Sequence, residues 1–275
     1  MPPAKPRDVI SPWVNPVTRA LRQGKVCLGA FSVAFGCEAV AQIFGRAGFH
    51  WYYMDMEHGR STYNEIAQMS IAAKLAGIVP IAGPTSLADH LVARPLDAGA
   101  MGVIAPHVET ADETEQVVKW CRYPPVGARG MLNRGIFNGF ESADAGEWAE
   151  AQNREVLVAV KVESGIGIDN IEEIASVPGL DAILIGPGDL STTLGIPGKT
   201  THPEVEACID KMLAAVKRHR IAGGPHLGRS PKDAARWADR GATFMSFTSD
   251  GGMLLEIASS TVRETRELLG ERLLG

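Results

Sequence analysis

The sequence predicts an α/β protein whose strands close into a (β/α)8 TIM barrel. Eight apolar runs alternate with amphipathic stretches along the 275 residues, and this alternation is typical of a parallel sheet covered by helices. Acidic residues stand at the C-terminal ends of several runs, where barrel enzymes place their chemistry. The rival fold, an open doubly wound sheet, lacks support because the chain has no Walker loop and no G-x-G-x-x-G after its first strand.

The strands are predicted from short apolar runs that end at turn-forming residues. The run at 156–162 is apolar except for Lys161, and the run at 182–185 stops at Gly186-Pro187-Gly188. Uninterrupted runs of this length are typical of strands buried on both faces. The predicted strands cover Val26–Val33, His50–Glu57, Val79–Ala82, Gly102–Val108, Val156–Glu163, Ala182–Ile185, Ile221–Gly224 and Phe244–Phe247.

The helices are predicted from apolar residues at helical spacing between these runs. Several end at a glycine just before the next strand, namely Gly77, Gly99 and Gly241, as expected for left-handed C-caps. The predicted helices cover Glu38–Ala47, Tyr63–Ala76, Leu87–Ala98, Ala111–Cys121, Asn170–Ser176, Pro203–His219, Pro231–Arg240 and Leu254–Leu269.

Two segments do not belong to the regular alternation of strands and helices. Arg122–Glu147 is the longest irregular piece, and we expect it to fold over the mouth of the barrel. The last helix, Leu254–Leu269, has a partly helical apolar pattern that suits packing either on its own barrel or on a neighbouring subunit.

Composition favours one domain over residues 1–275, because a barrel of about 250 residues is a usual size. The net charge of −5 gives no basic surface for nucleic acid. No apolar run approaches the length that spans a bilayer, and the N-terminus lacks the apolar core of a signal peptide. The four scattered cysteines fit a reducing compartment. We therefore expect a cytoplasmic protein without nucleic-acid or membrane partners.

Glu163 and Asp189 predict a metal site. Each follows an apolar strand, and oxygen ligands at two strand ends suit a hard divalent cation. Each carboxylate has a purely structural alternative: Glu163 pairing with Arg129 or Arg134, and Asp189 capping the next helix together with Ser191.

The second predicted strand ends in M-D-M-E-H-G, which supplies Asp55, Glu57 and His58. A histidine beside a carboxylate is the usual pairing for a general base near neutral pH. Lys161 lies two residues before Glu163 and therefore on the same strand face. An acid/base group beside a Lewis acid predicts carbon–carbon bond chemistry next to a carbonyl. His107 and His226 also follow strands and could enter the site, but core or surface roles are the simpler interpretation for both.

These residues lie in motifs that resemble the HpcH/HpaI family of class II, metal-dependent pyruvate aldolases. Its relatives include 2,4-dihydroxyhept-2-ene-1,7-dioate aldolase and 2-dehydro-3-deoxyglucarate aldolase. The resemblance runs from Leu28 to about Leu255. The matching motifs are A-G-F-H-W-Y-Y-M-D-M-E-H-G (47–59), L-D-A-G-A-M-G-V-I-A-P-H-V-E-T-A (96–111), R-Y-P-P-V-G-A-R-G (122–130), V-K-V-E-S (160–164) and I-G-P-G-D-L-S (185–191).

The resemblance implies a (β/α)8 barrel that assembles as a trimer or hexamer, with its last helix exchanged between subunits. It implies that Glu163 and Asp189 bind Mg²⁺, Mn²⁺ or Co²⁺, and that His58 is the acid/base residue oriented by Asp55. The backbone around Gly186, Gly188 and Asp189 would hold the carboxylate of a 2-oxo acid. The reaction implied is cleavage of a 4-hydroxy-2-oxo acid, through an enolate on the metal, to pyruvate or an analogue and an aldehyde.

Two positions depart from the family pattern. Gly83 stands where typical members carry an arginine that contacts the oxo group, and Lys161 stands where they carry glutamine. We expect Gly83 to widen the pocket and Lys161 to replace the lost positive charge, or else to form a local ion pair. The missing arginine keeps one alternative open, a metal-dependent oxaloacetate decarboxylase or a Claisen-type, citrate synthase- or lyase-like enzyme. A separate alternative is a degenerate barrel that binds a metabolite without turnover.

Overall fold

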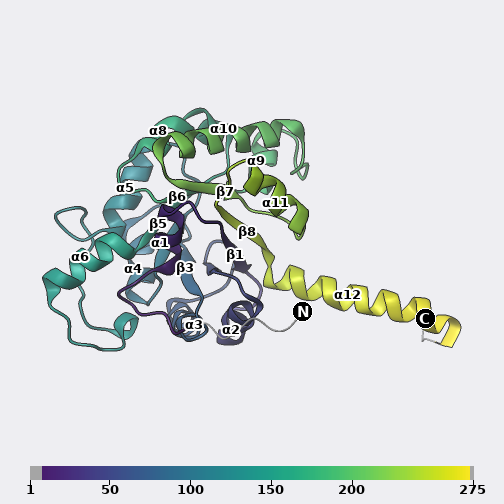
Figure 1. The fold of residues 1–275 in the computed structure, drawn as a ribbon, viewed down its shortest axis with the longest axis horizontal. Coiled ribbons are helices and arrows are strands. Elements are labelled where there is room, and N and C mark those ends of the chain that lie inside the picture. Colours follow the sequence, from purple (N-terminus) through teal and green to yellow (C-terminus); the bar gives the residue numbers. More distant parts are fainter. Residues whose placement is uncertain (1–7, 273–275) are drawn as a thin grey trace.

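The computed structural model describes residues 8–272, and its eight parallel strands form a (β/α)8 barrel with helices around it (Figure 1). All eight predicted strands are confirmed, with ends that shift by a few residues at most. The strands are β1 (Cys27–Ser32), β2 (Trp51–Asp55), β3 (Val79–Gly83), β4 (Gly102–Ala105), β5 (Leu157–Val162), β6 (Ala182–Ile185), β7 (Ala222–Pro225) and β8 (Phe244–Ser249).

The sheet closes on itself as a barrel requires. Each strand pairs in parallel with its neighbours in the order β7-β6-β5-β4-β3-β2-β1-β8. The seam between β7 and β8 is closed by backbone hydrogen bonds from Thr243 to Gly223 (2.9 Å) and from Leu227 to Ser246 (2.7 Å). All strands therefore end at one rim, which brings residues from distant parts of the sequence together.

Side chains alternate between the barrel interior and the helix layer, as the two-residue period of a strand requires. Along β2, Trp51 and Tyr53 belong to the interior cluster, whereas Tyr52 and Met54 pack outward with the helices. The interior is filled rather than hollow: Trp51 stacks on Phe244 with ring centroids 4.4 Å apart. A filled interior leaves only the rim available for a site.

The predicted helices are confirmed, and the last one begins four residues earlier than predicted. They are α2 (Glu38–Ala47), α3 (Tyr63–Leu75), α4 (Asp89–Asp97), α5 (Ala111–Cys121), α8 (Ile171–Ser176), α10 (Pro203–His219), α11 (Pro231–Asp239) and α12 (Asp250–Leu269). Four helices were not predicted, namely α1 (Pro16–Arg22), α6 (Ala145–Glu155), α7 (Gly165–Asp169) and α9 (Pro187–Thr193). Three of these have five to seven residues, too few for a clear apolar period.

The irregular segment 122–147 does not fold over the mouth, so that expectation is wrong. It packs on the last turns of α3 and α4, where the Lys74 ammonium donates to the carbonyl of Phe137 (2.8 Å) and Arg129 pairs with Asp97 (2.6 Å). The reason is topological. The segment follows a helix and precedes a strand, and in this fold such connections lie at the end opposite the rim.

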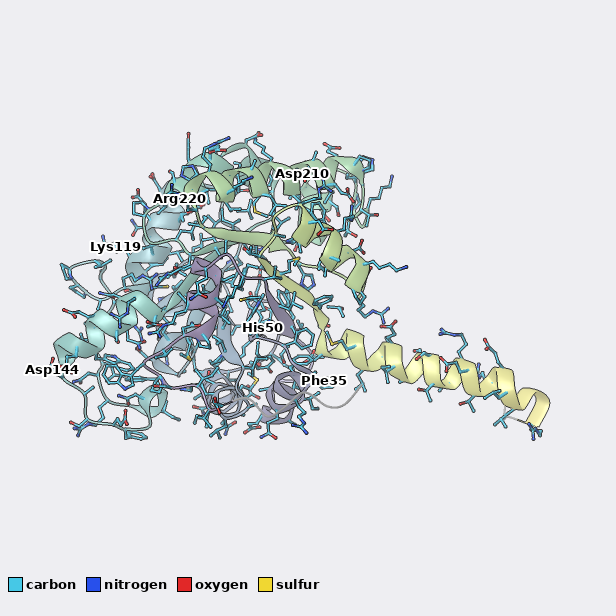
Figure 2. All side chains as sticks on the ribbon, viewed as in Figure 1. Phe35, His50, Lys119, Asp144, Asp210 and Arg220 are labelled. Atoms are coloured by element: carbon cyan, nitrogen blue, oxygen red, sulfur yellow. The ribbon has the colours of Figure 1, made fainter. Side chains whose placement is uncertain are left out.

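Helix α12 extends away from the barrel (Figure 1). Its first residue, Asp250, is buried, and its carboxylate accepts hydrogen bonds from the backbone of Val33, Ala34 and Phe35 at 3.0–3.2 Å. Met253 packs against the barrel core and Glu256 pairs with Arg229, and the rest of the helix projects away from the barrel (Figure 2). No helix within residues 8–272 is long and apolar enough to cross a membrane.

Candidate active site

The strand ends bring the predicted site residues to one rim. Asp55 is the last residue of β2, Gly83 the last of β3, and Glu163 directly follows β5. Asp189 lies in the first turn of α9, directly after β6. Asp189 and Glu163 line the same pocket of about 210 Å³, together with His107, Glu109, Ser164, Thr192 and Thr193.

Asp55 shapes the turn after β2. Its carboxylate is buried and accepts hydrogen bonds from the backbone N–H groups of Glu57 (2.8 Å) and His58 (3.1 Å). The imidazole of His58 lies instead toward Glu57, with 3.8 Å between Nε2 and the carboxylate, and is exposed at the rim. Asp55 therefore positions the backbone of His58, and Glu57 is the carboxylate beside its ring.

Lys161 forms the buried ion pair that the sequence analysis gave as its local alternative. Its ammonium lies 3.2 Å from Glu57 and 3.5 Å from Glu163, and its side chain is 5% exposed. Burial alone would lower the pKa of Lys161, but Tyr53, Glu163, Glu57 and Asp55 raise it above its ordinary value. These neighbours favour the charged ammonium, which pairs with the two carboxylates.

His107 enters the site. Its Nε2 lies 2.5 Å from Glu57 and its Nδ1 lies 3.6 Å from Glu163. The residue adopts a left-handed backbone conformation with φ of 52°, which is uncommon outside glycine. Although burial opposes it, Lys161 and His107 hold the pKa of Glu57 below its ordinary value. Glu57 is thus an ionised carboxylate shared by Lys161 and His107.

Glu163 fits a cation ligand. Its Oε2 is buried and has no hydrogen-bond partner within residues 8–272. Burial raises the pKa of Glu163 to about 7; Asp189 and Glu57 add to the rise, while Lys161 and His107 oppose it. Gly186 permits this placement, because a Cβ there would lie 2.1 Å from Glu163 Oε1.

The excess of negative charge at the rim also indicates a cation site. Five carboxylates lie at this rim, on Asp55, Glu57, Glu109, Glu163 and Asp189. Among residues 8–272, Lys161 is the one lysine or arginine that forms an ion pair with any of them, and its partners are Glu57 and Glu163. Across residues 8–272, no three His, Cys, Asp or Glu side chains converge as a complete ligand set. Two carboxylates suffice for Mg²⁺, which keeps several waters or substrate oxygens as its other ligands.

Gly83 does not widen the pocket, so that expectation is wrong. A Cβ at Gly83 would lie 1.8 Å from the hydroxyl oxygen of Tyr53. The tyrosine side chain rises from the middle of β2 and fills the volume into which residue 83 points. Its bulk also excludes an arginine at that position.

No catalytic role is predicted from the sequence for Glu57 or Tyr53, and a core or surface role is preferred there for His107. Glu57 and His107 follow strands, which is the signal that could have identified them. Tyr53 resembles an ordinary core residue, and no sequence signal distinguishes it. His226 also reaches the rim, where its Nδ1 lies 2.8 Å from the Ser246 hydroxyl. Burial, with a smaller effect of Lys161, lowers the pKa of His226 to about 4, so its imidazole is neutral.

Residues 31–256 match the sequence profile of the HpcH/HpaI aldolase/citrate lyase family. The chain belongs to this family. It is 32% identical over 235 residues to a 5-keto-4-deoxy-D-glucarate aldolase of Klebsiella pneumoniae, which covers 83% of this chain and 91% of the relative. It is 29% identical over 262 residues to a hydroxypyruvate/pyruvate aldolase of Paraburkholderia phytofirmans, covering 94% and 100%.

Solved structures agree with this membership. An HpcH/HpaI aldolase from Desulfitobacterium hafniense is 29% identical and superimposes with a TM-score of 0.87, covering 92% of this chain and 97% of the other. A citrate synthase of the same fold is 28% identical with a TM-score of 0.83, covering 92% and 98%. This family member is accordingly an enzyme of the carbon–carbon lyase class, as its aldolase relatives are.

Proposed function

We propose that this family member is a divalent-metal-dependent aldolase that cleaves a 4-hydroxy-2-oxo acid to pyruvate, or a close analogue, and an aldehyde. The observation that carries the proposal is the buried Oε2 of Glu163, which accepts no hydrogen bond within residues 8–272 and lines one pocket with Asp189 at the strand ends. Glu163 and Asp189 would hold Mg²⁺, Mn²⁺ or Co²⁺. When bound, the cation neutralises charge that develops on the 2-oxo acid.

The chain's own residues supply the remaining functions. The backbone around Gly186, Gly188 and Asp189 holds the substrate carboxylate, because the first turn of α9 has backbone N–H groups without intrahelical partners. His58 takes the proton from the 4-hydroxyl group as the C3–C4 bond breaks. Glu57, 3.8 Å from His58, stabilises the imidazolium that results.

Removal of the metal tests this function. We expect the protein to release pyruvate from 4-hydroxy-2-oxo acids in the presence of Mg²⁺ or Mn²⁺, to lose this activity in excess chelator, and to regain it when the cation is restored. Coupled oxidation of NADH by lactate dehydrogenase measures the pyruvate. Activity that the chelator does not change would contradict the metal role.

A second candidate function uses the same metal site for a different reaction. Position 83 carries no arginine, and the similarity to a citrate synthase supports a Claisen-type reaction or decarboxylation of oxaloacetate. The same preparation distinguishes the two. Release of CO2 from oxaloacetate without any cleavage of 4-hydroxy-2-oxo acids would favour the second candidate.

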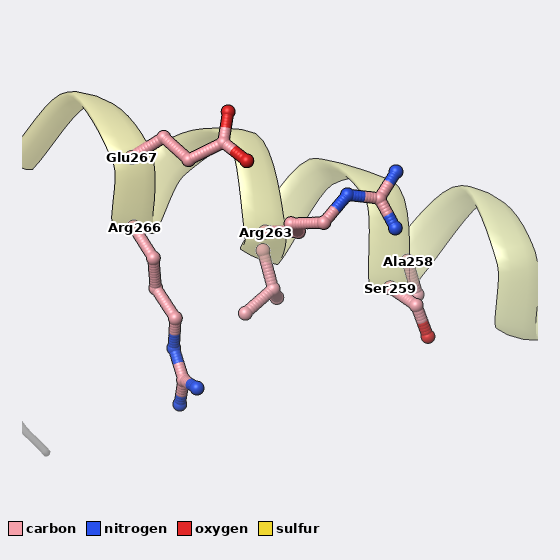
Figure 3. Close-up of a pocket in the computed structure, with 6 residues that line it drawn as sticks. Ala258, Ser259, Arg263, Arg266 and Glu267 are labelled. Atoms are coloured by element: carbon pink, nitrogen blue, oxygen red, sulfur yellow. The ribbon is translucent and has the colours of Figure 1, made fainter.

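We also propose that the chain forms one barrel domain that assembles into a homo-oligomer through α12. Leu255 is 69% exposed and Leu268 is 80% exposed. A hollow of about 510 Å³ along the helix is lined only by residues of α12 (Figure 3). Where α12 leaves the barrel, an apolar groove of about 850 Å³ lies between Leu28, Phe49, Phe247 and the start of the helix. Such apolar surfaces are typical of subunit contacts.

A charge on the apolar side of α12 should disrupt this assembly. We expect Leu255→Glu/Val262→Glu to lower the mass measured by light scattering, because both side chains point to one side of the helix, seven residues apart. Ser260→Glu adds a charge to the opposite side and should keep the mass of the parent protein. A wild-type monomer at micromolar concentration, or an unchanged mass of the double variant, would contradict the proposal.

A further inference from the structure

Tyr53 and Gly83 compete for one volume at the barrel rim. Tyr53 is fully buried, and its ring packs on Phe31 with centroids 4.2 Å apart. A Cβ at Gly83 would meet the tyrosine's hydroxyl oxygen at 1.8 Å and its Cζ at 2.2 Å. Gly83 pairs in register with Asp55. The hydroxyl group of Tyr53 therefore lies level with Gly83 and Asp55, the last residues of β3 and β2, where the site begins.

The Tyr53 hydroxyl lacks a protein partner. Within residues 8–272 it is buried without a hydrogen bond. The neighbouring Tyr52, also fully buried, points to the other side of the strand and places its hydroxyl 3.3 Å from Met69 Sδ. Leaving a buried donor unpaired is costly, and such groups in native proteins call for an explanation such as a bound molecule.

The surroundings of the hydroxyl are the charged groups of the site. Burial raises the pKa of Tyr53 above its ordinary value; Lys161 opposes the rise, and Asp55, Glu163 and Glu57 add to it. The phenol therefore keeps its proton at neutral pH and acts as a hydrogen-bond donor. Lys161 donates a hydrogen bond to Glu57 (3.2 Å) and lies 3.5 Å from Glu163.

We propose that Tyr53 is a further catalytic residue, whose hydroxyl donates a hydrogen bond to the oxo oxygen of the bound 2-oxo acid. The inference rests on the proposed function. As the C3–C4 bond breaks, its electron pair becomes the enolate C=C bond and the carbonyl π pair moves to this oxygen. A donor already aimed at the developing charge lowers the barrier. Tyr53 retains its proton throughout.

The Tyr53→Phe variant tests this role, with Tyr52→Phe as the matched control on the same strand. We expect kcat for cleavage to fall on the order of 10²-fold in Tyr53→Phe, as for loss of one oxyanion donor. Its Mn²⁺ affinity and its Tm without ligand should not fall, because the hydroxyl has no protein partner. Tyr52→Phe should keep kcat within about threefold of wild type.

Two results would overturn the inference: a kcat of Tyr53→Phe within threefold of wild type, or a loss of kcat with a parallel fall in Tm. Oxalate, a planar dianion that resembles the enolate of pyruvate, gives a second readout by calorimetry in the presence of Mn²⁺. If the wild type cleaves no 4-hydroxy-2-oxo acid, the proposed function fails. Weaker oxalate binding by Tyr53→Phe alone then still supports a ligand-binding hydroxyl, and equal binding by all three proteins rejects it.

Discussion

Glu163→Gln and Asp189→Asn should each abolish binding of the divalent cation and lower lyase activity by roughly 10³-fold or more, since the metal contributes several kcal/mol to the transition state. Both carboxylates line one pocket, and the Oε2 of Glu163 has no hydrogen-bond partner among residues 8–272. An amide keeps the shape of each side chain and removes its charge. Binding of Mn²⁺, followed by electron paramagnetic resonance, measures the effect directly.

The affinity for the divalent cation should depend on pH because of Glu163. Because burial raises its pKa to about 7, a proton competes with the cation, and we expect cation affinity to fall as the pH drops below 7.

His58→Ala is the control for the two ligand variants: it should bind Mn²⁺ with unchanged affinity and lose roughly 10²–10⁴-fold in rate, as expected for loss of an acid/base group. Unchanged Mn²⁺ affinity in Glu163→Gln or Asp189→Asn would remove that residue as a ligand.

Lys161→Gln should lower both stability and turnover. The ammonium is the partner of two carboxylates, on Glu57 and Glu163, and its side chain is 5% exposed. Removing one partner of a buried ion pair costs about 3–5 kcal/mol, because the remaining charge is left uncompensated. We expect the free energy of unfolding in urea to fall by about this amount, or by less where Glu163 takes up a proton. Turnover falls because the site loses its permanent cation.

Lys74→Gln is the matched control for this prediction. Lys74 is also a buried lysine, and its ammonium donates to the carbonyl of Phe137. Burial lowers the pKa of Lys74 to about 8, and the contact lies at the end of the barrel opposite the rim. This variant should therefore leave turnover unchanged. Wild-type turnover in Lys161→Gln would leave no catalytic role for that residue.

The structure also changes how a family-like site would be restored. An arginine at position 83 collides with the Tyr53 hydroxyl, so Lys161→Gln/Gly83→Arg alone leaves no space for the new side chain. Replacing Tyr53 by leucine as well removes the collision. The three positions lie on β2, β3 and β5, and they form one unit only because their side chains share the barrel mouth.

Much of this protein follows from its sequence alone. All eight strands, eight of the helices and family membership were predicted because apolar periodicity and motif order are local properties of the chain. The site residues of the sequence analysis do reach one rim, since a closed parallel barrel places all strand ends together. The short helices α7 and α9 escaped prediction because five to seven residues show no clear period.

Tertiary structure alone decided which side chains meet at that rim. The sequence pattern predicted open space at Gly83, but Tyr53, 30 residues earlier, fills it. It left His107 in the core or on the surface, but the imidazole lies between Glu57 and Glu163. It placed 122–147 over the mouth, although that segment packs at the opposite end. Such contacts depend on side-chain volume and direction across different strands, and a one-dimensional pattern does not contain that information.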